Sequence, residues 1–284
     1  MEKYYRFAGV EVAVITRNEW MYEDDRTLAP FRVGETVNPY RFEFVLVDKL
    51  TPPAGTMVAY MDDLLVYEDG DCCLRYKGVS ARDWSKAYIR TSRCGAVHKV
   101  EVKTSAIPNG ITAKTVLNAI GAEHLIASKH GFVFHSSYID IGGRAILFTA
   151  PSGTGKSTQA DLWHDLRGAR ILNGDRSAIC STEDGVVVCG IPFKGSSQYC
   201  ENVTLPLAGI VYLAQAPRTS IRLLRPVEAF RRVWEGVSVN IWDKNDVSKV
   251  MDTLSRVVQS VPVWHLACTP DESAVIALEE QLGK

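Results

Sequence analysis

The chain has 284 residues, a formal net charge of −1 and a hydrophobic fraction of 46%. This length suits one large domain or two small ones, and the apolar fraction is sufficient for a folded core. A net charge near zero gives no support for binding to nucleic acid or to an anionic membrane. No stretch approaches the run of about 18 apolar residues that a spanning helix needs, so we expect neither nucleic acid nor a membrane as a partner.

The N-terminus and the cysteines both indicate a cytoplasmic protein. The first apolar run is short and lies close to Glu2 and Glu11, which does not fit a secretory signal. The cysteines are odd in number, and their spacing matches no zinc site and no disulfide framework. We therefore expect reduced, buried thiols at Cys72, Cys73, Cys94, Cys180, Cys189, Cys200 and Cys268.

Short strand-like segments fill the first part of the chain, up to about residue 107. Polar and apolar residues alternate in residues 40–48, as in a strand with one buried face. Further strands are expected over residues 9–16, 57–67, 72–79, 86–92 and 98–107. Residues 68–71 are typical of a hairpin turn, so we predict a mostly antiparallel sheet. The carboxylates of Asp62, Asp63 and residues 68–71 are expected to be exposed turn residues rather than metal ligands.

A turn signal at Asn109 and Gly110 marks a change of pattern. We therefore divide the chain into a strand-rich N-terminal region, residues 1–110, and a second domain, residues 111–284. After this boundary, Thr112 can cap a helix that runs to about residue 129. Gly131 would end that helix.

The next segment predicts a hairpin. Residues 132–141 are strand-like, and Gly142 and Gly143 form a tight turn into a second strand, residues 144–148. This arrangement places His135 on the strand beside the one that leads into the following loop. A buried core histidine with satisfied hydrogen bonds is the alternative to a functional role for His135.

Residues 150–157 match the phosphate-binding loop pattern, with alanine where the usual pattern has its first glycine. An apolar strand precedes the loop and a helix-prone run follows it. Gly153 and Gly155 allow backbone conformations that a side chain would forbid, so that the N–H groups and the helix start can face an anion. Lys156 would neutralise the outer phosphates, and the Ser157 hydroxyl would bind Mg²⁺. The alternative is an ordinary glycine–serine turn before a helix with a solvated lysine.

Asp175 follows a short apolar strand, residues 169–172. A carboxylate at that position, next to a phosphate-binding loop, can meet Mg²⁺ or take the proton of an attacking hydroxyl. The alternative is a solvated turn residue or a helix cap. Trp163 and His164, on the helix after the loop, are expected to be packing residues.

The remainder of the chain alternates strands and helices. A hairpin is expected over residues 177–189, strands over residues 207–213 and 261–266, and helices over residues 227–233, 247–258 and 270–282. Residues 193–198 form a loop in which Lys194, Ser196 and Ser197 are available to a ligand. Arg218, Arg222 and Arg225 could clamp a phosphate, although a solvated basic face is the expectation that we favour.

The order of these motifs resembles the catalytic core of the HPr kinase/phosphorylase family and its smaller relatives. Those proteins share the phosphoenolpyruvate-carboxykinase type of nucleotide-binding fold. In their pattern a histidine strand, a tight turn, a second strand and the phosphate-binding loop precede an acidic pair. The matching residues are His135, Lys156, Ser157, Asp175, Asn202, Pro206, Leu207, Leu213, residues 190–195 and residues 269–274. The resemblance covers residue 111 to the end, and Gly174 stands where family members often have the first of two aspartates.

The resemblance implies an α/β fold with α+β character and an ATP- and Mg²⁺-dependent kinase that phosphorylates a hydroxyl of a small molecule, peptide or protein. His135, Lys156 and Asp175 would be catalytic, and Ser157 and Asp175 would hold the metal. The ATP would be bound by Ser152, Gly153, Thr154, Gly155, Lys156, Ser157 and Thr158.

Some alternatives stay open. HPr itself is not expected as the acceptor, because the chain has no clear counterpart of the C-terminal segment that engages it. The short chain disfavours a phosphoenolpyruvate carboxykinase. Gly174 motivates a second hypothesis, an ATP-binding regulatory or peptide-docking protein with little catalysis. The acceptor, the choice among ATP, GTP and pyrophosphate, and the oligomeric state, including a homo-oligomer, are not determined by the sequence.

Overall fold

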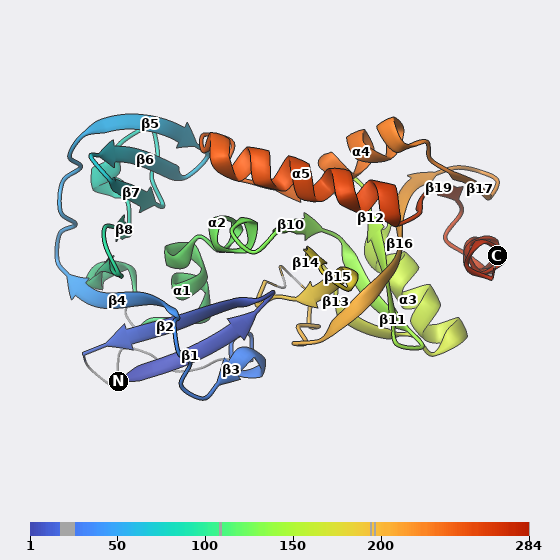
Figure 1. Cartoon of the computed structure of the whole chain (residues 1–284), viewed down its shortest axis with the longest axis horizontal. Helices are drawn as coiled ribbons and strands as arrows, with labels where there is room; N and C mark the ends of the chain where they lie inside the picture. Colours follow the sequence, from blue (N-terminus) through green and yellow to red (C-terminus); the bar gives the residue numbers. More distant parts are fainter. Residues whose placement is uncertain (18–25, 108–109, 194, 196, 284) are drawn as a thin grey trace. The chain divides into compact units, whose positions relative to one another are not determined.

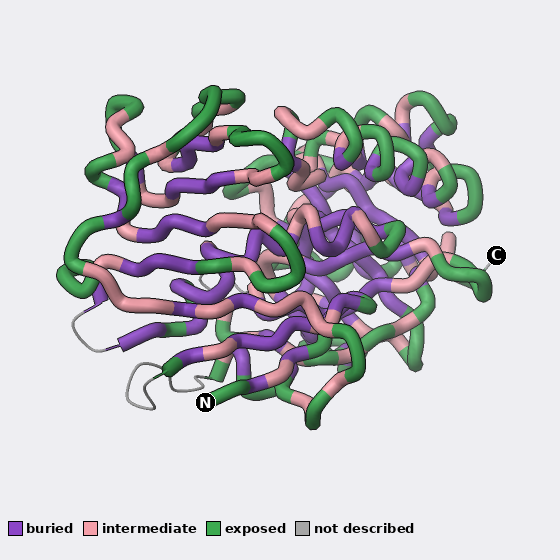
Figure 2. Tube along the Cα trace, turned by 60° about the vertical axis from the view of Figure 1, so that its left-hand side comes forward, coloured by how far each residue is buried: buried purple, intermediate pink, exposed green. Residues whose placement is uncertain are grey.

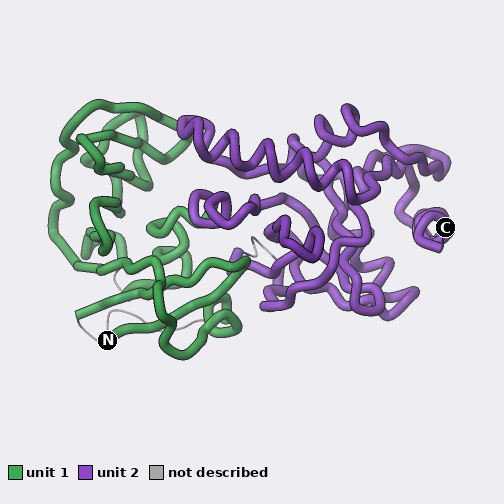
Figure 3. Tube along the Cα trace, viewed as in Figure 1, with its two compact units in different colours: residues 1–122 green, residues 123–284 purple. Residues whose placement is uncertain are grey.

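A computed structural model describes residues 1–17, 26–107, 110–193, 195 and 197–283. Within these ranges the chain forms two compact units, Met1–Ala122 and Glu123–Lys284 (Figure 3). Helix α1 (Ala113–Ile120) belongs to the first unit, where the Thr91 hydroxyl donates a hydrogen bond to the carbonyl of Ala119 at 2.9 Å. Asn109 lies outside the described residues, and the division at residue 110 stays a prediction.

The first unit is built on one twisted sheet, whose strands are ordered β3-β1-β2-β4-β9-β8-β7-β6-β5 (Figure 1). β4 pairs in parallel with β2 and β9, and the other neighbours in this order are antiparallel, which confirms a mostly antiparallel sheet. The strands are β1 (Glu2–Phe7), β2 (Val10–Thr16), β3 (Arg32–Val33), β4 (Tyr40–Val47), β5 (Thr56–Met61), β6 (Leu64–Asp69), β7 (Cys72–Lys77), β8 (Ile89–Arg93) and β9 (Val97–Lys103).

The prediction of one strand over residues 57–67 is wrong, because the chain turns between β5 and β6. Asp62 has a φ of 49° at this turn, in the left-handed region that aspartate tolerates better than most residues. Its neighbour Asp63 accepts a hydrogen bond from the Lys77 ammonium at 2.5 Å. These carboxylates are therefore turn residues, and one of them is part of an ion pair.

The expectation that all cysteines are reduced is also wrong, because Cys72 and Cys94 form a disulfide. β7 and β8 are antiparallel neighbours with Cys73 opposite Arg93, which brings Cys72 at the start of β7 close to Cys94 just after β8. The pairing depends on strand register rather than on a spacing motif. The other five cysteines are not part of a disulfide; Cys73 is half-buried, and Cys180, Cys189, Cys200 and Cys268 are buried.

The helix predicted over residues 112–129 is two helices, α1 and α2 (Ala122–Ala127). Thr112 caps α1 as expected, because its hydroxyl accepts a hydrogen bond from the Thr115 N–H at 3.4 Å. Gly121 then adopts a φ of 58° and ends α1. The Arg93 guanidinium bonds the carbonyl oxygens of Ile120 and Gly121, so the carbonyls exposed at this break have partners.

The second unit contains a mixed sheet between two layers of helices. Within the described residues the main strand order is β13-β11-β12-β16-β15-β14-β10-β18, and β19 pairs with β16 and β17. The strands are β10 (Gly131–His135), β11 (Ser137–Ile141), β12 (Arg144–Thr149), β13 (Arg170–Asn173), β14 (Arg176–Thr182), β15 (Gly185–Gly190), β16 (Thr204–Gln215), β17 (Ser220–Leu223), β18 (Val237–Ser238) and β19 (Val263–Cys268). The helices are α3 (Lys156–Arg167), α4 (Pro226–Trp234), α5 (Lys244–Ser260) and α6 (Glu272–Leu282).

Two apolar cores lie on opposite faces of this sheet. On one face Trp163 of α3 and Leu278 of α6 pack against β12 and β16. On the other face Val233 of α4 and Leu254 of α5 pack against β10, β12 and β16. Figure 2 shows the buried residues, in purple, concentrated in the strands of each unit. The mixed α/β class predicted from the sequence is confirmed.

The strand predicted over residues 132–141 is interrupted at Ser136. β10 pairs with β14 and β18, whereas β11 pairs with β12 and β13. The Ser136 N–H donates to the Asp175 carbonyl at 3.0 Å, which holds the chain at this break. The prediction that His135 lies on the strand beside β12 is therefore wrong, although the Thr149 hydroxyl at the end of β12 donates to the His135 carbonyl at 3.0 Å.

Among the helices of the described residues, none is both long enough and apolar enough to cross a membrane. The short 3-10 helices η2 (Ala29–Phe31), η3 (Trp84–Lys86) and η4 (Thr104–Ala106) complete the elements of the first unit.

Candidate active site

A glycine-rich loop connects β12 to α3 and occupies residues 150–155. Gly153 and Gly155 have φ values of 78° and 119°, which side-chain-bearing residues rarely adopt. Gly155 is also the N-cap of α3, and no side chain hydrogen-bonds to this helix start in the described structure. The first N–H groups of α3 are therefore available to an external anion, which the positive end of the helix dipole would favour.

Lys156, the first residue of α3, folds back over this loop. Its ammonium donates to the carbonyl oxygens of Ala150 at 3.0 Å and Pro151 at 3.4 Å. The residue is only 8% exposed. Burial lowers the pKa of Lys156, and the nearby Asp175 carboxylate opposes that shift. A bound anion would supply the negative charge that this desolvated ammonium lacks.

Asp175 and His135 lie close to each other beside the glycine-rich loop. The His135 Nδ1 lies 3.5 Å from Asp175 Oδ1. The turn that presents Asp175 is fixed by Asn173, whose side-chain oxygen accepts from the backbone N–H groups of Asp175 at 2.9 Å and Arg176 at 3.1 Å. Burial lowers the pKa of His135, Lys156 lowers it further, and Asp175 acts in the opposite direction. The imidazole is therefore biased toward the neutral form.

The structure brings most of the predicted site residues together in one hollow of about 510 Å³. Its lining includes His135, Ser152, Gly153, Gly155, Lys156, Ser157, Thr158 and Asp175. Ser137 and Tyr199 also line it and were not predicted. Ser137 directly follows Ser136, where the strand is interrupted between β10 and β11. The sequence pattern predicts one continuous strand there. Tyr199 lies beyond the glycine- and serine-rich loop, where no motif singles it out.

A second hollow of about 630 Å³ begins on the other side of the glycine-rich loop. It is formed by Gly153 and Thr154, by residues 213–217 at the end of β16, and by residues 268–270 at the end of β19. Leu213, Pro217 and Pro270 give it apolar walls. Thr154 lies here rather than in the first hollow. Gly153, Gly155 and Thr158 line both hollows, so the loop is their common boundary.

Gly174 has a steric reason to lack a side chain. A Cβ atom there would lie 2.5 Å from the Ser197 Oγ and 2.9 Å from the Ser197 Cβ, closer than real contacts allow. A Cβ on Gly195 would likewise meet the carboxylate of Asp175. Gly195 and Ser197 therefore lie close against the residues before β14. Lys194 and Ser196, which the sequence offered as ligands, lie outside the described residues.

We expect Gly174→Ala to lower the free energy of unfolding by about 2 kcal/mol, because the new methyl group overlaps Ser197. Gly174→Asp should cost at least as much and should not add a usable carboxylate. Urea denaturation measures both. In a Ser197→Gly background, most of the penalty of Gly174→Ala should disappear. An equal penalty in both backgrounds would show that the contact with Ser197 is not the cause.

Of the two residues expected to pack, Trp163 does so, whereas His164 is exposed. Trp163 is 1% exposed in the core between α3 and the sheet. The His164 imidazole is hydrogen-bonded to the carbonyl of Ala169 at 2.9 Å, where the chain leaves α3. Arg222 and Arg225 do not line either hollow beside the glycine-rich loop, so they do not clamp an anion at that loop.

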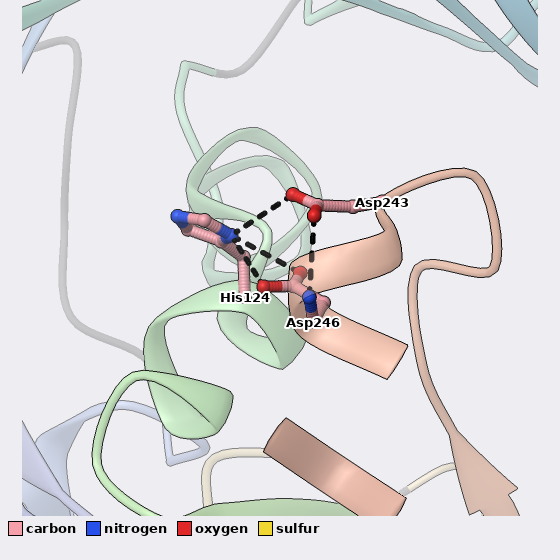
Figure 4. A group of neighbouring side chains, drawn as sticks. All are labelled: His124, Asp243 and Asp246. Carbon is pink, nitrogen blue, oxygen red and sulfur yellow. Dashed lines mark hydrogen bonds and ion pairs between the residues drawn. The ribbon is translucent and has the colours of Figure 1, made fainter. Parts of the chain in front are cut away.

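A separate cluster of His124, Asp243 and Asp246 was not singled out from the sequence (Figure 4). One potential ligand atom from each residue lies within 4.8 Å of the others. These atoms already have partners. The His124 Nδ1 lies 3.0 and 3.1 Å from the Asp246 oxygens, the Asn240 amide donates to Asp246 at 2.9 Å, and Asp243 caps α5. We assign the cluster to the structural attachment of α2 to the start of α5.

We expect Asp246→Ala to reduce the free energy of unfolding by about 2 kcal/mol at neutral pH, because it leaves the buried Asn240 donor without its acceptor. Burial raises the pKa of Asp246, but the hydrogen bonds from His124 and Asn240 outweigh burial and the net shift is downward. The stabilisation is therefore present above the ordinary aspartate pKa and is lost as the pH falls through the lowered folded-state pKa.

Urea denaturation at several pH values measures this loss, with Asp252→Ala on the exposed side of α5 as the control. The control should change stability by less than about 0.5 kcal/mol. The difference between wild type and Asp246→Ala should shrink in acid. A difference that stays constant down to the acid transition would contradict the assignment.

No protein-family model and no curated protein matches this sequence. Among solved structures, the Hpr(Ser) kinase/phosphatase from Coxiella burnetii aligns with 53% of this chain and 97% of its own, at 11% sequence identity and a TM-score of 0.31. This likeness is weak and establishes neither a family nor a shared fold. The mixed α/β class rests on the sheets and helices described above.

Proposed function

We propose that this protein is a Mg²⁺-dependent kinase that transfers the γ-phosphoryl group of ATP to a hydroxyl acceptor. The observation that carries the proposal is the position of the glycine-rich loop between two hollows that share Gly153, Gly155 and Thr158. A nucleotide on that loop could place its base between the apolar walls of the second hollow. Its terminal phosphate would then point toward Lys156 and Asp175.

The charges around the first hollow support this assignment. Lys156 and the N–H groups at the start of α3 would hold the phosphates, which is the main requirement of phosphoryl transfer. Mg²⁺ prefers oxygen ligands, and the Ser157 hydroxyl and the Asp175 carboxylate are oxygen donors in the same hollow. Bound there, the metal would neutralise charge on the transferred group.

Two carboxylates line this hollow, Asp161 of α3 and Asp175, and Asp175 has two possible roles. Asp175 is placed either to hold the metal or to take the proton of the acceptor hydroxyl. His135, biased toward its neutral form and 3.5 Å from Asp175, can orient that carboxylate or donate to the phosphoryl group. We propose that His135 acts mainly through Asp175, because its Nδ1 faces that carboxylate and Asn173 holds the Asp175 turn in place.

Incubation with γ-labelled ATP, Mg²⁺ and pooled metabolites or peptides tests the proposal. Label should pass to an acceptor with wild-type protein and should not pass with Lys156→Ala. Parallel reactions with labelled GTP and pyrophosphate identify the preferred donor. ATP binding without transfer to any acceptor would contradict a kinase.

The second candidate is an ATP-binding regulatory or peptide-docking protein with little catalysis. It is favoured by Gly174, which leaves one carboxylate where two would divide the metal and base roles. This candidate predicts the same dependence of ATP binding on Lys156 but no dependence of any turnover on Asp175. Transfer rates of the Asp175→Asn variant therefore separate the two candidates.

A further inference from the structure

A groove of about 900 Å³ follows helix α4 in the second unit. It is lined by four arginines and two glutamates, Arg222, Arg225, Arg231, Arg232, Glu228 and Glu235, and we call it the arginine groove. Leu223 and Val227, which are 60% and 77% exposed, add apolar surface around the start of α4. Arginine, unlike the other charged residues, is enriched in surfaces that bind proteins.

The charges of the arginine groove are not balanced. Arg222 forms a two-bond pair with Glu228 at 2.6 and 2.9 Å, and Arg232 pairs with Glu235 at 3.2 Å. Both glutamates are therefore engaged. Within the part of the chain that the structure describes, Arg225 and Arg231 are exposed and form no ion pair. The groove thus keeps two positive charges available for carboxylates of a partner.

The groove is connected to the candidate active site through the sheet. Thr149 of β12 lies opposite Tyr212 of β16, Tyr212 lies opposite His265 of β19, and His265 lies opposite Arg222 of β17. Residues paired in this way present their side chains to the same face. Tyr212 confirms the arrangement, because its ring lies 6.0 Å from the His265 ring and 4.8 Å from the Arg232 guanidinium.

The segment that ends the groove is also hydrogen-bonded to the backbone of His135. The Tyr212 hydroxyl donates to Glu235 at 2.9 Å, and the next residue, Gly236, accepts a hydrogen bond from the His135 N–H at 2.8 Å. Thr149 and Arg222 lie on the first and last of four neighbouring strands, so three inter-strand spacings lie between them. With about 4.8 Å between strands this is a span of roughly 14 Å, which an extended polypeptide covers in about four residues.

We propose that the arginine groove binds a carboxylate-bearing segment of a polypeptide, with Arg225 and Arg231 as the main contacts. Resting on the proposed kinase activity, we infer that this polypeptide is the acceptor, and that its hydroxyl lies about four residues or more from its acidic residues. The arginines supply planar donors that suit carboxylates. The remaining Arg–Glu pairs hold the groove in shape.

Fluorescence anisotropy without ATP tests the groove directly. The probe is a labelled peptide of roughly twelve residues, long enough to exceed the predicted span, with one serine followed by a run of glutamates. The double variant Arg225→Glu/Arg231→Glu should raise its Kd by about tenfold, and the wild-type Kd should rise with salt. Arg256→Glu on α5 is the matched control and should leave the Kd unchanged. A peptide with glutamine in place of glutamate should bind weakly to every form.

The phosphorylation of the same peptide gives a second readout. The double variant should raise KM by about tenfold and leave kcat and the thermal melting temperature unchanged. Equal Kd values for wild type and the double variant would contradict peptide binding at the arginine groove. So would a wild-type protein that does not bind the acidic peptide. Both conclusions hold whatever the transfer assay gives. Peptide binding that depends on Arg225 and Arg231 without any transfer of label would support binding at the arginine groove and overturn the inference that the bound polypeptide is the acceptor.

Discussion

Replacing Lys156 by alanine is expected to weaken ATP binding by about hundredfold and to abolish detectable phosphoryl transfer. Lys156 is 8% exposed, and its ammonium donates hydrogen bonds to two carbonyl oxygens of the loop. It is therefore the positive charge nearest to the helix start that a phosphate would occupy. Isothermal titration calorimetry with MgATP measures the loss of affinity, and Lys249→Ala, an exposed change on α5, is the control.

The affinity for ATP should also depend on pH in a way that identifies Lys156. Burial lowers the pKa of this ammonium, so the free protein loses the charge at a lower pH than an ordinary lysine would. ATP affinity should fall as the pH rises through that lowered pKa, and the fall should be absent in Lys156→Ala. Binding by Lys156→Ala at the wild-type Kd would show that phosphates do not contact the loop.

The second large effect is expected for Asp175→Asn, which should lower the transfer rate by about thousandfold and change the Kd for ATP by less than about fivefold. Asparagine keeps the size of the side chain and leaves the turn fixed by Asn173. It removes the charge that would hold the metal and the base that would accept a proton. The variant therefore separates nucleotide binding from chemistry.

Single-turnover experiments with γ-labelled ATP measure this rate, with Asp165→Asn on the exposed side of α3 as the control. The control should stay within about twofold of wild type. His135→Gln should lower the rate less than Asp175→Asn, because we propose that His135 orients Asp175 rather than contacting the acceptor itself. A transfer rate in Asp175→Asn equal to wild type would exclude Asp175 from both roles.

The parts of the site that the sequence predicted are those encoded by local pattern. The glycines, Lys156 and Ser157 lie within a few residues of one another, and the strand and helix on either side follow from simple periodicity. Asp175 was found because a carboxylate directly after a short strand is a local signal as well. The structure places these residues around one hollow, while their roles stay predictions.

The parts that the sequence did not predict depend on contacts between distant segments. The strand is interrupted at Ser136, whose N–H donates to the Asp175 carbonyl, and the sequence pattern of residues 132–141 does not predict this interruption. The Cys72–Cys94 disulfide follows from strand register. Gly174 looked like a missing acid, whereas the clash with Ser197 shows that the position has no room for a side chain. The connection of Arg222 to His135 required the strand order of the second sheet.

A structure of the protein with a non-hydrolysable ATP analogue and Mg²⁺ tests the central proposal most directly. We predict phosphate oxygens within about 3 Å of the Lys156 ammonium and of the N–H groups at the start of α3. We also predict the metal beside the Ser157 hydroxyl and the Asp175 carboxylate, and the base between residues 213–217 and 268–270. A nucleotide bound elsewhere, or one whose phosphates avoid Lys156, would contradict the assignment of this loop.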